Sequence, residues 1–337
     1  MKLFTKNEYS PLKSVIIGRP DNAHWPAGDI FFDKMLSLIS EDYKPSPGPI
    51  DKKVIQETRD DLFTLIDSLK ENGIEVYRPD PLDMSKTIVG YKHTVTGMHN
   101  YNVRDIILSV GNKMIECPTP YLSRQHEYIS YQTIKQEVLL SGGEWIVAPI
   151  PPIDEKEIPT IQSRIRITER YPVFNASNIM KFNDKLLYLI SNTANYAGAK
   201  WLQQIVGTEF EVITWDKVHS FANIDNIINP LNNNTILINA ESVSGDNLPK
   251  FLKSFKKIWI HNCYDKGARY FPYASKWIGM STLSIDPETV YVESDQIDII
   301  KNIRNAGFKV ISDVCLRHSK TLGGGLHSVT CDLEREL

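Results

Sequence analysis

The sequence predicts an α/β fold in which small modules of strands and a helix are arranged around an axis. The first observation is a unit that recurs along the chain: an amphipathic helix, a break that is usually a glycine, and a short apolar strand. The second is the spacing of these units, about 50 to 70 residues, which suits strand–strand–helix–strand modules in a propeller-like ring better than a small solenoid. The third is a hydrophobic content of 42% in 337 residues, enough to bury a large core.

The five copies of the unit occupy residues 69–77, 139–149, 205–215, 252–261 and 303–313. A glycine separates helix from strand in every copy but the fourth, at Gly73, Gly143, Gly207 and Gly307. Glycine ends helices because it accepts positive φ at little steric cost, and the β-branched and aromatic residues that follow favour a strand. Each copy therefore predicts a helix followed by a strand.

The first helix shows the pattern most fully. Asp51 is placed to cap it and Gly73 to end it. Apolar residues recur at helical spacing between them, at Val54, Ile55, Leu62, Leu65, Ile66 and Leu69. Two hairpins are also predicted, one through Asn183 and Asp184, the other through Asp286 and Pro287, because turn residues there adjoin apolar strands.

Charge and hydropathy argue against two classes of partner. Lys plus Arg number 38 and Asp plus Glu 41, a formal charge of -3, with no basic block that would follow a phosphate backbone. No apolar run approaches the roughly 20 residues needed to cross a bilayer, and residues 1–8 lack the apolar core of a cleavable leader. We therefore expect no nucleic-acid partner, no membrane association and a cytoplasmic location.

Four widely spaced cysteines show neither CxxC spacing nor a nearby histidine pair, so we expect free thiols and no metal site. They are Cys117, Cys263, Cys315 and Cys331. Cys117 and Cys315 lie in apolar stretches typical of buried structural thiols. Only Cys331 lies in a segment with functional context.

That segment, residues 323–333, is similar to the one in which arginine:glycine-type amidinotransferases carry a cysteine nucleophile. Further blocks carry the resemblance at 103–128, 172–202, around His219 and at 275–277, and more loosely at 7–18. The resemblance implies a five-bladed α/β-propeller of the pentein type, with pseudo-fivefold ββαβ modules around a central pocket and residues 1–337 as a single domain. In that family a cysteine attacks the guanidinium carbon of arginine, a histidine moves protons, an aspartate orients it, and carboxylates hold the guanidinium.

Carried over residue by residue, the resemblance gives an altered site. His219 stands at the histidine position and Asp105 matches a guanidinium-binding aspartate. Asn175 stands where the aspartate partner of the histidine belongs, and Ser328 where the nucleophile belongs.

Four further residues are expected to bind substrate. Phe221 falls near a second guanidinium-binding aspartate, and Ser242 near the arginine that holds the substrate carboxylate. Asn178 and Ser275 belong to the matching blocks. Replacing carboxylates with an amide and a phenyl ring removes most of the attraction for a planar cation, so free arginine is a poor candidate substrate.

Serine attacks only beside a base and a stabilised oxyanion, so Ser328 requires His219 as its base. Asn175 could hold the imidazole by accepting from its ring N–H, which favours acyl transfer over amidine transfer. Cys331 ranks second as nucleophile, because on a strand a spacing of three residues places its side chain on the face opposite Ser328. The tight run Gly323 to Gly325 predicts a turn near the pocket rather than a phosphate cradle.

Three interpretations remain open. The chain is a diverged transferase that moves an acyl or amidine-like group between small molecules, in specialised natural-product biosynthesis, with a carrier-protein thioester as one form of donor. Alternatively it is a binding or regulatory pseudoenzyme, or a variant in which a native cysteine was changed to Ser328 to trap a complex. No cofactor is implied, and a homodimer is compatible with all three.

Overall fold

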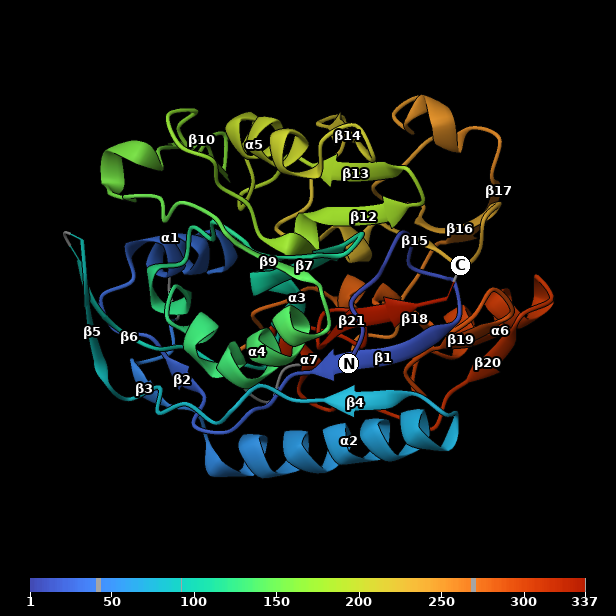
Figure 1. The fold of residues 1–337 in the computed structure, drawn as a ribbon, viewed down its shortest axis with the longest axis horizontal. Coiled ribbons are helices and arrows are strands. Elements are labelled where there is room, and N and C mark those ends of the chain that lie inside the picture. Colours follow the sequence, from blue (N-terminus) through green and yellow to red (C-terminus); the bar gives the residue numbers. More distant parts are fainter. Residues whose placement is uncertain (41–43, 92, 268–270, 337) are drawn as a thin grey trace.

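Five three-stranded sheets form the ring that the sequence predicts (Figure 1). The computed structural model describes residues 1–40, 44–91, 93–267 and 271–336. In each sheet the first strand pairs antiparallel with the second, which pairs parallel with the third. The five-bladed α/β-propeller is thus confirmed. The blades are β21 (Thr330–Arg335), β1 (Leu12–Ile17), β4 (Glu75–Tyr77); β7 (Ile107–Val110), β8 (Lys113–Glu116), β9 (Glu144–Val147); β12 (Ile179–Phe182), β13 (Lys185–Leu189), β14 (Glu211–Trp215); β15 (Ile228–Pro230), β16 (Thr235–Asn239), β17 (Lys256–Ile260); β18 (Leu283–Ser284), β19 (Thr289–Tyr291), β20 (Lys309–Ile311).

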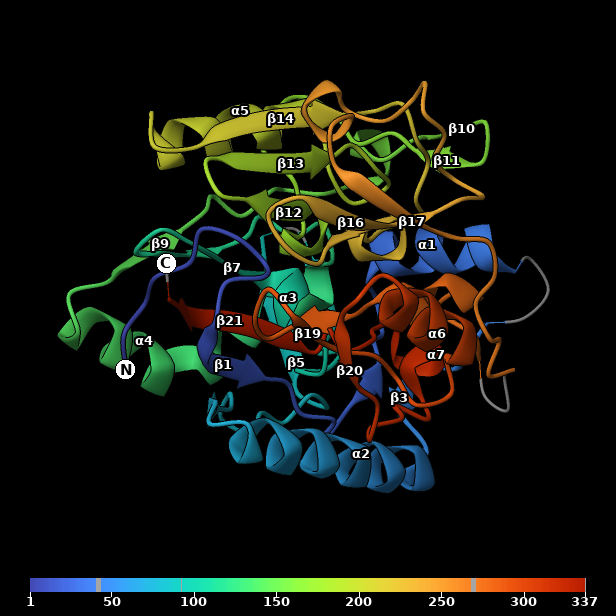
Figure 2. The ribbon, with the colours of Figure 1, turned by 90° about the vertical axis from the view of Figure 1, so that its right-hand side faces the viewer.

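A helix connects the second strand to the third in four blades. These helices are α2 (Lys52–Glu71), α4 (Gln132–Leu140), α5 (Tyr196–Val206) and α6 (Ile297–Asn305). In Figure 2 they lie at the periphery, with α5 at the top, α6 at the right, α2 at the bottom and α4 at the left. Apolar clusters fill the space between neighbouring blades; one of them joins side chains of β12 and β13 to those of β15 and β16. The core is therefore distributed around the ring.

The fourth predicted helix is wrong. The fourth blade has only a 3-10 turn, η6 (Lys250–Leu252), before β17. Gly245 and Pro249 interrupt the segment between β16 and β17, and both residues oppose a continuous helix there.

The other four modules and both hairpins are confirmed, except that the glycine with positive φ after α4 is Gly142, at 85°, and not Gly143. Asp51 caps α2 by accepting from the N–H of Lys53 at 2.7 Å, and Gly73, with φ of 76°, follows its end. Asn183 has φ of 57° in the turn between β12 and β13. In the second hairpin Asp286 Oδ1 accepts from the N–H groups of Glu288 and Thr289.

A short helical turn precedes the first strand of every blade, and we call these five segments the inner turns. They are α3 (Val103–Ile106), η4 (Ala176–Asn178), η5 (Ile224–Asn226), η7 (Lys276–Met280) and α7 (Ser319–Leu322). Successive inner turns contact one another, α3 with η4, η4 with η5, η5 with η7 and η7 with α7, and α3 also contacts β21. They therefore surround the middle of the ring, where α3 lies in Figure 2.

The remaining elements belong to none of the five blades or the inner turns. They are β2 (His24–Trp25), α1 (Ile30–Ile39), β3 (Gly48–Pro49), β5 (Thr87–Gly90), β6 (His93–Thr96), η1 (Leu122–Arg124), η2 (Glu127–Tyr131), η3 (Glu155–Glu157), β10 (Thr160–Ile161) and β11 (Arg164–Ile165).

The first blade joins the two ends of the chain. Strand β21 pairs antiparallel with β1, and Nη1 of Arg335 donates to the carbonyl of Ser10 at 2.6 Å across 325 positions of sequence. Figure 1 marks both termini beside this blade.

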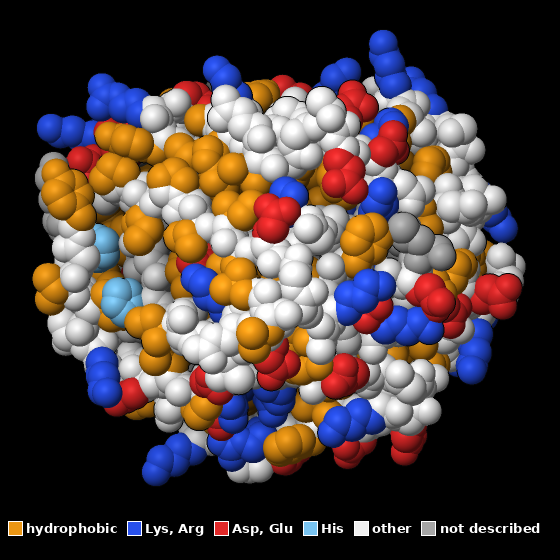
Figure 3. All heavy atoms as spheres, viewed as in Figure 1, with side chains coloured by type: hydrophobic (Ala, Val, Ile, Leu, Met, Phe, Trp, Pro, Cys, Tyr) orange, Lys and Arg blue, Asp and Glu red, His pale blue; other side chains and the backbone are white. Residues whose placement is uncertain are grey.

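The molecular surface mixes charges of both signs. On the face drawn in Figure 3, Lys and Arg side chains are interspersed with Asp and Glu. Among the described residues, none of the helices is both long and apolar enough to cross a membrane. The four cysteines are free thiols.

Candidate functional site

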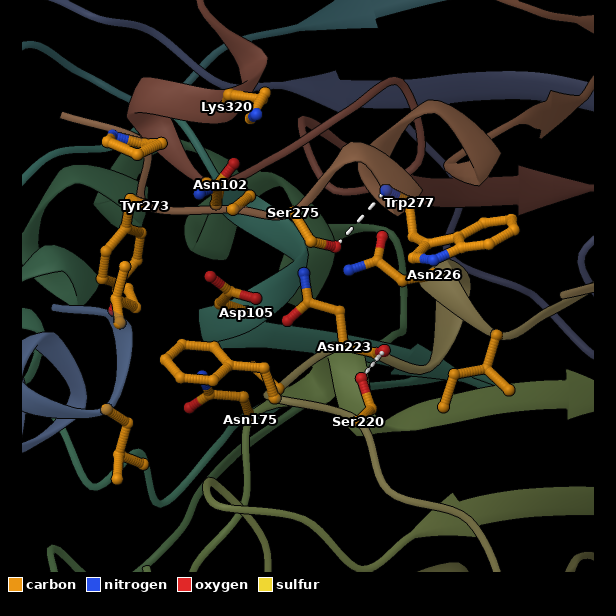
Figure 4. Close-up of a pocket in the computed structure, with 18 of the residues that line it drawn as sticks. Asn102, Asp105, Asn175, Ser220, Asn223, Asn226, Tyr273, Ser275, Trp277 and Lys320 are labelled. Carbon is orange, nitrogen blue, oxygen red and sulfur yellow. Dashed lines mark hydrogen bonds between the residues drawn. The ribbon is translucent and has the colours of Figure 1, made fainter. Parts of the chain in front are cut away.

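A cavity of about 450 Å³ opens where the five inner turns meet. Six of the residues expected from the sequence line it: Asp105, Asn175, His219, Phe221, Ser242 and Ser275. Figure 4 shows Asp105, Asn175 and Ser275 around one space, although they come from different blades. The volume and the mixed lining suit a small-molecule ligand.

The inner turns place equivalent side chains around this cavity. Asn102, Asn175, Asn223 and Ser275 each stand immediately before an inner turn, and all four line the cavity. Asn102, Asn223 and Asn226 were missed in the sequence. A repeated pattern could have found them, since residues 102–106, 175–179 and 223–227 all read Asn, two variable residues, Asp or Asn, then Ile.

Several polar atoms in the cavity wall lack partners. Among the described residues, no hydrogen bond reaches Oδ1 of Asn102, Asp105, Asn175 or Asn226. The first three of these side chains are more than nine-tenths buried. Because a buried acceptor without a partner is costly, this wall suits a ligand that donates several hydrogen bonds.

One buried arginine balances the acidic groups behind the wall. Arg124 donates to both carboxylate oxygens of Glu127, to Oδ2 of Asp105 at 2.5 Å and to the carbonyl of Asn102 at 3.0 Å. Asp105 is the carboxylate among the described lining residues, and one of its two oxygens is already bonded to Arg124. The cavity therefore offers a cation one free carboxylate oxygen.

The same network shifts the pKa values of two buried groups. Burial raises the pKa of Glu127 to about 7, although Arg124 opposes the rise. Burial and the nearby charge of Arg124 lower the pKa of His99, which lines the cavity, to about 3. The His99 imidazole is therefore neutral near pH 7 and can both donate and accept.

His219 lies on the rim of the cavity with an exposed side chain. Its ring has no hydrogen-bond partner among the described residues, and Oδ1 of Asn175 is also free, so the expected bond between these two side chains is absent from this structure. Burial, followed by the charges of Arg164 and Arg166, lowers the pKa of His219. The histidine is therefore neutral, and able to act as a base, at a lower pH than a free imidazole.

Replacing Arg166 with glutamine should raise the pKa of His219, because a neighbouring positive charge disfavours the imidazolium. The measurement is an NMR titration of the His219 ring protons in the chain and in R166Q. Arg170→Gln is the matched control, since Arg170 is exposed and paired with Glu157 at 3.3 Å. An unchanged titration in R166Q would show that Arg166 does not act on His219.

Ser328 lies beside the cavity but is completely buried and does not line it. Its Oγ donates to Oδ2 of Asp225 at 2.9 Å and accepts from Nδ2 of Asn223 at 3.4 Å. Neither bond leads to His219. Asn223, which does line the cavity, contacts Ser328 directly, so it separates the hydroxyl from the open space.

Two other predicted residues lie outside the lining. Asn178 is fully buried, where its Oδ1 accepts from the N–H of Asn175 at 3.3 Å and its Nδ2 donates to the carbonyl of Ala222. It supports the wall from behind. Cys331 packs in an apolar cluster with its thiol toward the carbonyl of Ile107. Ser328 and Cys331 do not share a strand, because β21 begins at Thr330, so the predicted placement of their side chains on opposite faces of one strand is wrong.

The glycine-rich tail forms the expected tight turn. Gly323 ends α7 with φ of 77°. A Cβ on Gly324 would lie 1.8 Å from Oδ1 of Asn102, and one on Gly325 would lie 2.6 Å from Cβ of Ser281. Only glycine allows the chain to pass this close to the wall of the cavity.

Relatives cover nearly the whole chain. Inosamine-phosphate amidinotransferase 1 of Streptomyces glaucescens is 34% identical over 333 residues, which are 98% of this chain and 95% of the relative. Mitochondrial glycine amidinotransferase of Gallus gallus is 28% identical over 356 residues, 98% of this chain and 82% of the relative. No family model matches the sequence.

The similar solved structures are also amidinotransferases or share their fold. Inosamine-phosphate amidinotransferase from Streptomyces griseus superposes with a TM-score of 0.92 at 33% identity, over 99% of this chain and 97% of that one. SxtG, an amidinotransferase from Microseira wollei in the saxitoxin biosynthetic pathway, gives 0.89 at 27% identity, over 99% and 98%. A dimethylarginine dimethylaminohydrolase from Pseudomonas aeruginosa, at 16% identity and a TM-score of 0.60, shares the fold.

Proposed function

Because this chain belongs to the amidinotransferase family, we propose that it transfers an acyl or amidine-like group between small molecules through a covalent intermediate on Ser328. In this proposal His219 is the acid and base, and the reaction belongs to specialised biosynthesis, as it does in the saxitoxin relative. The observation that carries the proposal is the central cavity, lined by His219 together with unpaired acceptors from three inner turns. A site that had lost its ligand would not need to keep these buried acceptors.

The charge of the cavity favours an acyl donor over arginine. A guanidinium is held most strongly by paired carboxylate oxygens, which form charged hydrogen bonds with its donors. The described wall offers one free carboxylate oxygen, at Asp105, beside the amide of Asn175 and the ring of Phe221. An uncharged acyl group carried by a molecule with several N–H or O–H donors matches this wall better.

In the acyl reaction the Oγ of Ser328 bonds to the acyl carbon, and the bond from that carbon to the leaving group breaks. The hydroxyl proton passes through His219 to the leaving group. An amine acceptor then bonds to the acyl carbon, the bond from that carbon to Oγ of Ser328 breaks, and the proton lost by the amine returns through His219 to Oγ. Asn223 has to turn aside first, because Ser328 is buried behind it. A cytoplasmic location, a donor bound to a carrier protein and a homodimer belong to the same proposal.

A binding protein without chemistry is the second candidate. One observation favours it: the Ser328 hydroxyl is buried and bonded to Asp225 and Asn223 rather than to His219. In that case the cavity holds a ligand and Ser328 only supports its wall.

Intact-protein mass spectrometry distinguishes the candidates. The chain is incubated with arginine and, separately, with free and carrier-bound acyl thioesters. We expect an acyl adduct from thioesters, lost in Ser328→Ala and slowed in His219→Ala. Arginine should give no adduct on the chain or on Ser328→Cys; an arginine adduct on that variant would restore ordinary amidine transfer. No adduct from any donor would favour the binding protein.

A further inference from the structure

A buried carboxylate that the proposed reaction does not use faces residue 328. Asp225, in η5, is 1% exposed, and its Oδ2 accepts from the hydroxyls of Ser328 at 2.9 Å and Ser281 at 2.7 Å. Nδ1 of His327 lies 3.4 Å from the same oxygen. The other oxygen, Oδ1, has no partner among the described residues. Three side chains thus converge on one carboxylate oxygen next to the candidate nucleophile.

The chain builds this contact from three separate segments. Inner turn η5 supplies Asp225, Ser281 follows η7, and the tail after Gly325 supplies Ser328. Gly325 allows the tail to pass against Ser281, because a Cβ there would lie 2.6 Å from that of Ser281. The N–H of His327 also donates to Oγ of Ser281 at 3.1 Å. Asp225 is therefore held firmly in place beside residue 328.

We infer that Asp225 determines which nucleophile can work at position 328: it orients a serine hydroxyl and excludes a cysteine thiolate. The inference deepens the proposed function, on which the catalytic importance of Ser328 rests. Asp225 is a positioning residue, since it touches the nucleophile rather than the cavity.

The preference follows from the chemistry of the two groups. A hydroxyl is a good donor to a carboxylate, whereas a thiol is a weak one. A thiolate at position 328 would stand beside a like charge, which disfavours the anion that makes cysteine a nucleophile. Burial alone would raise the pKa of Asp225. His327 and the hydroxyls of Ser281 and Ser328 outweigh this effect, so the pKa lies below its ordinary value and the carboxylate is charged near pH 7.

Among the described residues, no other charged side chain bonds to the hydroxyl of Ser328. Glu8 lies 3.4 Å from Nε2 of His327, and Arg104 pairs with Glu8 and with Asp332. The backbone N–H of Arg104 donates to the carbonyl of Ser328 at 3.2 Å, while its guanidinium reaches the carbonyl of His327. Arg104 shares these two carboxylates with Lys181 and Arg335, so this cluster holds three cations and two anions. Asp225 is the charge in direct contact with the side chain of residue 328.

The test introduces a cysteine and measures its ionisation. The ultraviolet absorbance of thiolate is followed against pH in Ser328→Cys, with the parent chain subtracted to remove the four native thiols. We expect a thiol pKa above the usual ~8.5. In the double variant Ser328→Cys with Asp225→Asn, which keeps the burial and removes the charge, the pKa should fall by about 1 pH unit or more.

Ser281→Ala combined with Ser328→Cys is the matched control. It disturbs the same carboxylate without removing its charge, so it should not lower the thiol pKa. Equal pKa values with and without Asp225 would overturn the inference. So would a pKa below ~8.5 in the single variant, a result that stands even if the double variant does not fold. The titration needs no turnover, so its failure is distinct from failure of the proposed transfer reaction.

Discussion

Replacing Arg124 with alanine should destabilise the fold by about 3–5 kcal/mol, the usual cost of removing one partner from a buried ion pair. Arg124 is 2% exposed and serves two carboxylates, those of Glu127 and Asp105. Without it both groups lose their shared partner, and each must stay charged with no countercharge or take up a proton. The measurement is the free energy of unfolding in urea for the chain and for R124A.

Arg170→Ala is the control for this experiment. Arg170 also forms an ion pair, with Glu157 at 3.3 Å, but its side chain is 74% exposed. Its loss should cost about 0–1 kcal/mol, because solvent screens an exposed pair. If R124A and R170A lowered the free energy of unfolding by the same amount, the network behind Asp105 would not support the cavity wall.

Placing carboxylates at positions 175 and 221 should create a guanidinium site. In the double variant Asn175→Asp with Phe221→Asp, a cation entering the cavity would meet two new carboxylates in addition to Asp105. Two charge-assisted hydrogen bonds, each contributing about 1.5–3 kcal/mol, correspond to arginine binding about 100-fold tighter or more than in the chain itself. Isothermal titration calorimetry with arginine measures the change.

Citrulline is the matched ligand, because it replaces the guanidinium of arginine with a neutral urea of similar shape. Its affinity should not rise in the double variant. A parallel gain for both ligands would mean that the substitutions had opened the cavity rather than charged it. An unchanged affinity for arginine would mean that residues 175 and 221 do not face the position of a guanidinium.

Much of the ring could be predicted because its signals are local. The helix from Lys52 to Glu71 combines an Asp51 cap, an apolar stripe and the glycine at 73, and all three are present in the structure. The fourth module failed because its apolar residues were not accompanied by a continuous helical run, and Pro249 leaves only a 3-10 turn. Pairing of β1 with β21 has no local signal, since it depends on closure of the whole ring.

Some residues of the candidate site could also be predicted from the sequence, and others could not. The resemblance led to Asp105, Asn175 and His219, and the structure brings all three to one cavity. It could not show that Ser328 is buried or that Asp225 is its partner, because these two residues are 103 positions apart and meet only through packing of η5 against the tail. Asn178 illustrates the converse: a residue in a matching block can support the wall without reaching the ligand.

Closure of the ring by its first blade also leads us to expect an order of folding. Joining Arg335 to Ser10 across 325 positions closes a very long loop, and the entropy cost of this closure is smaller once the intervening blades are compact. Ser328 lies directly before β21, so it reaches Asp225 and Asn223 in the same event. We therefore expect the cavity wall to be completed last, and a chain that has folded its outer helices but not yet joined its ends to have no binding site.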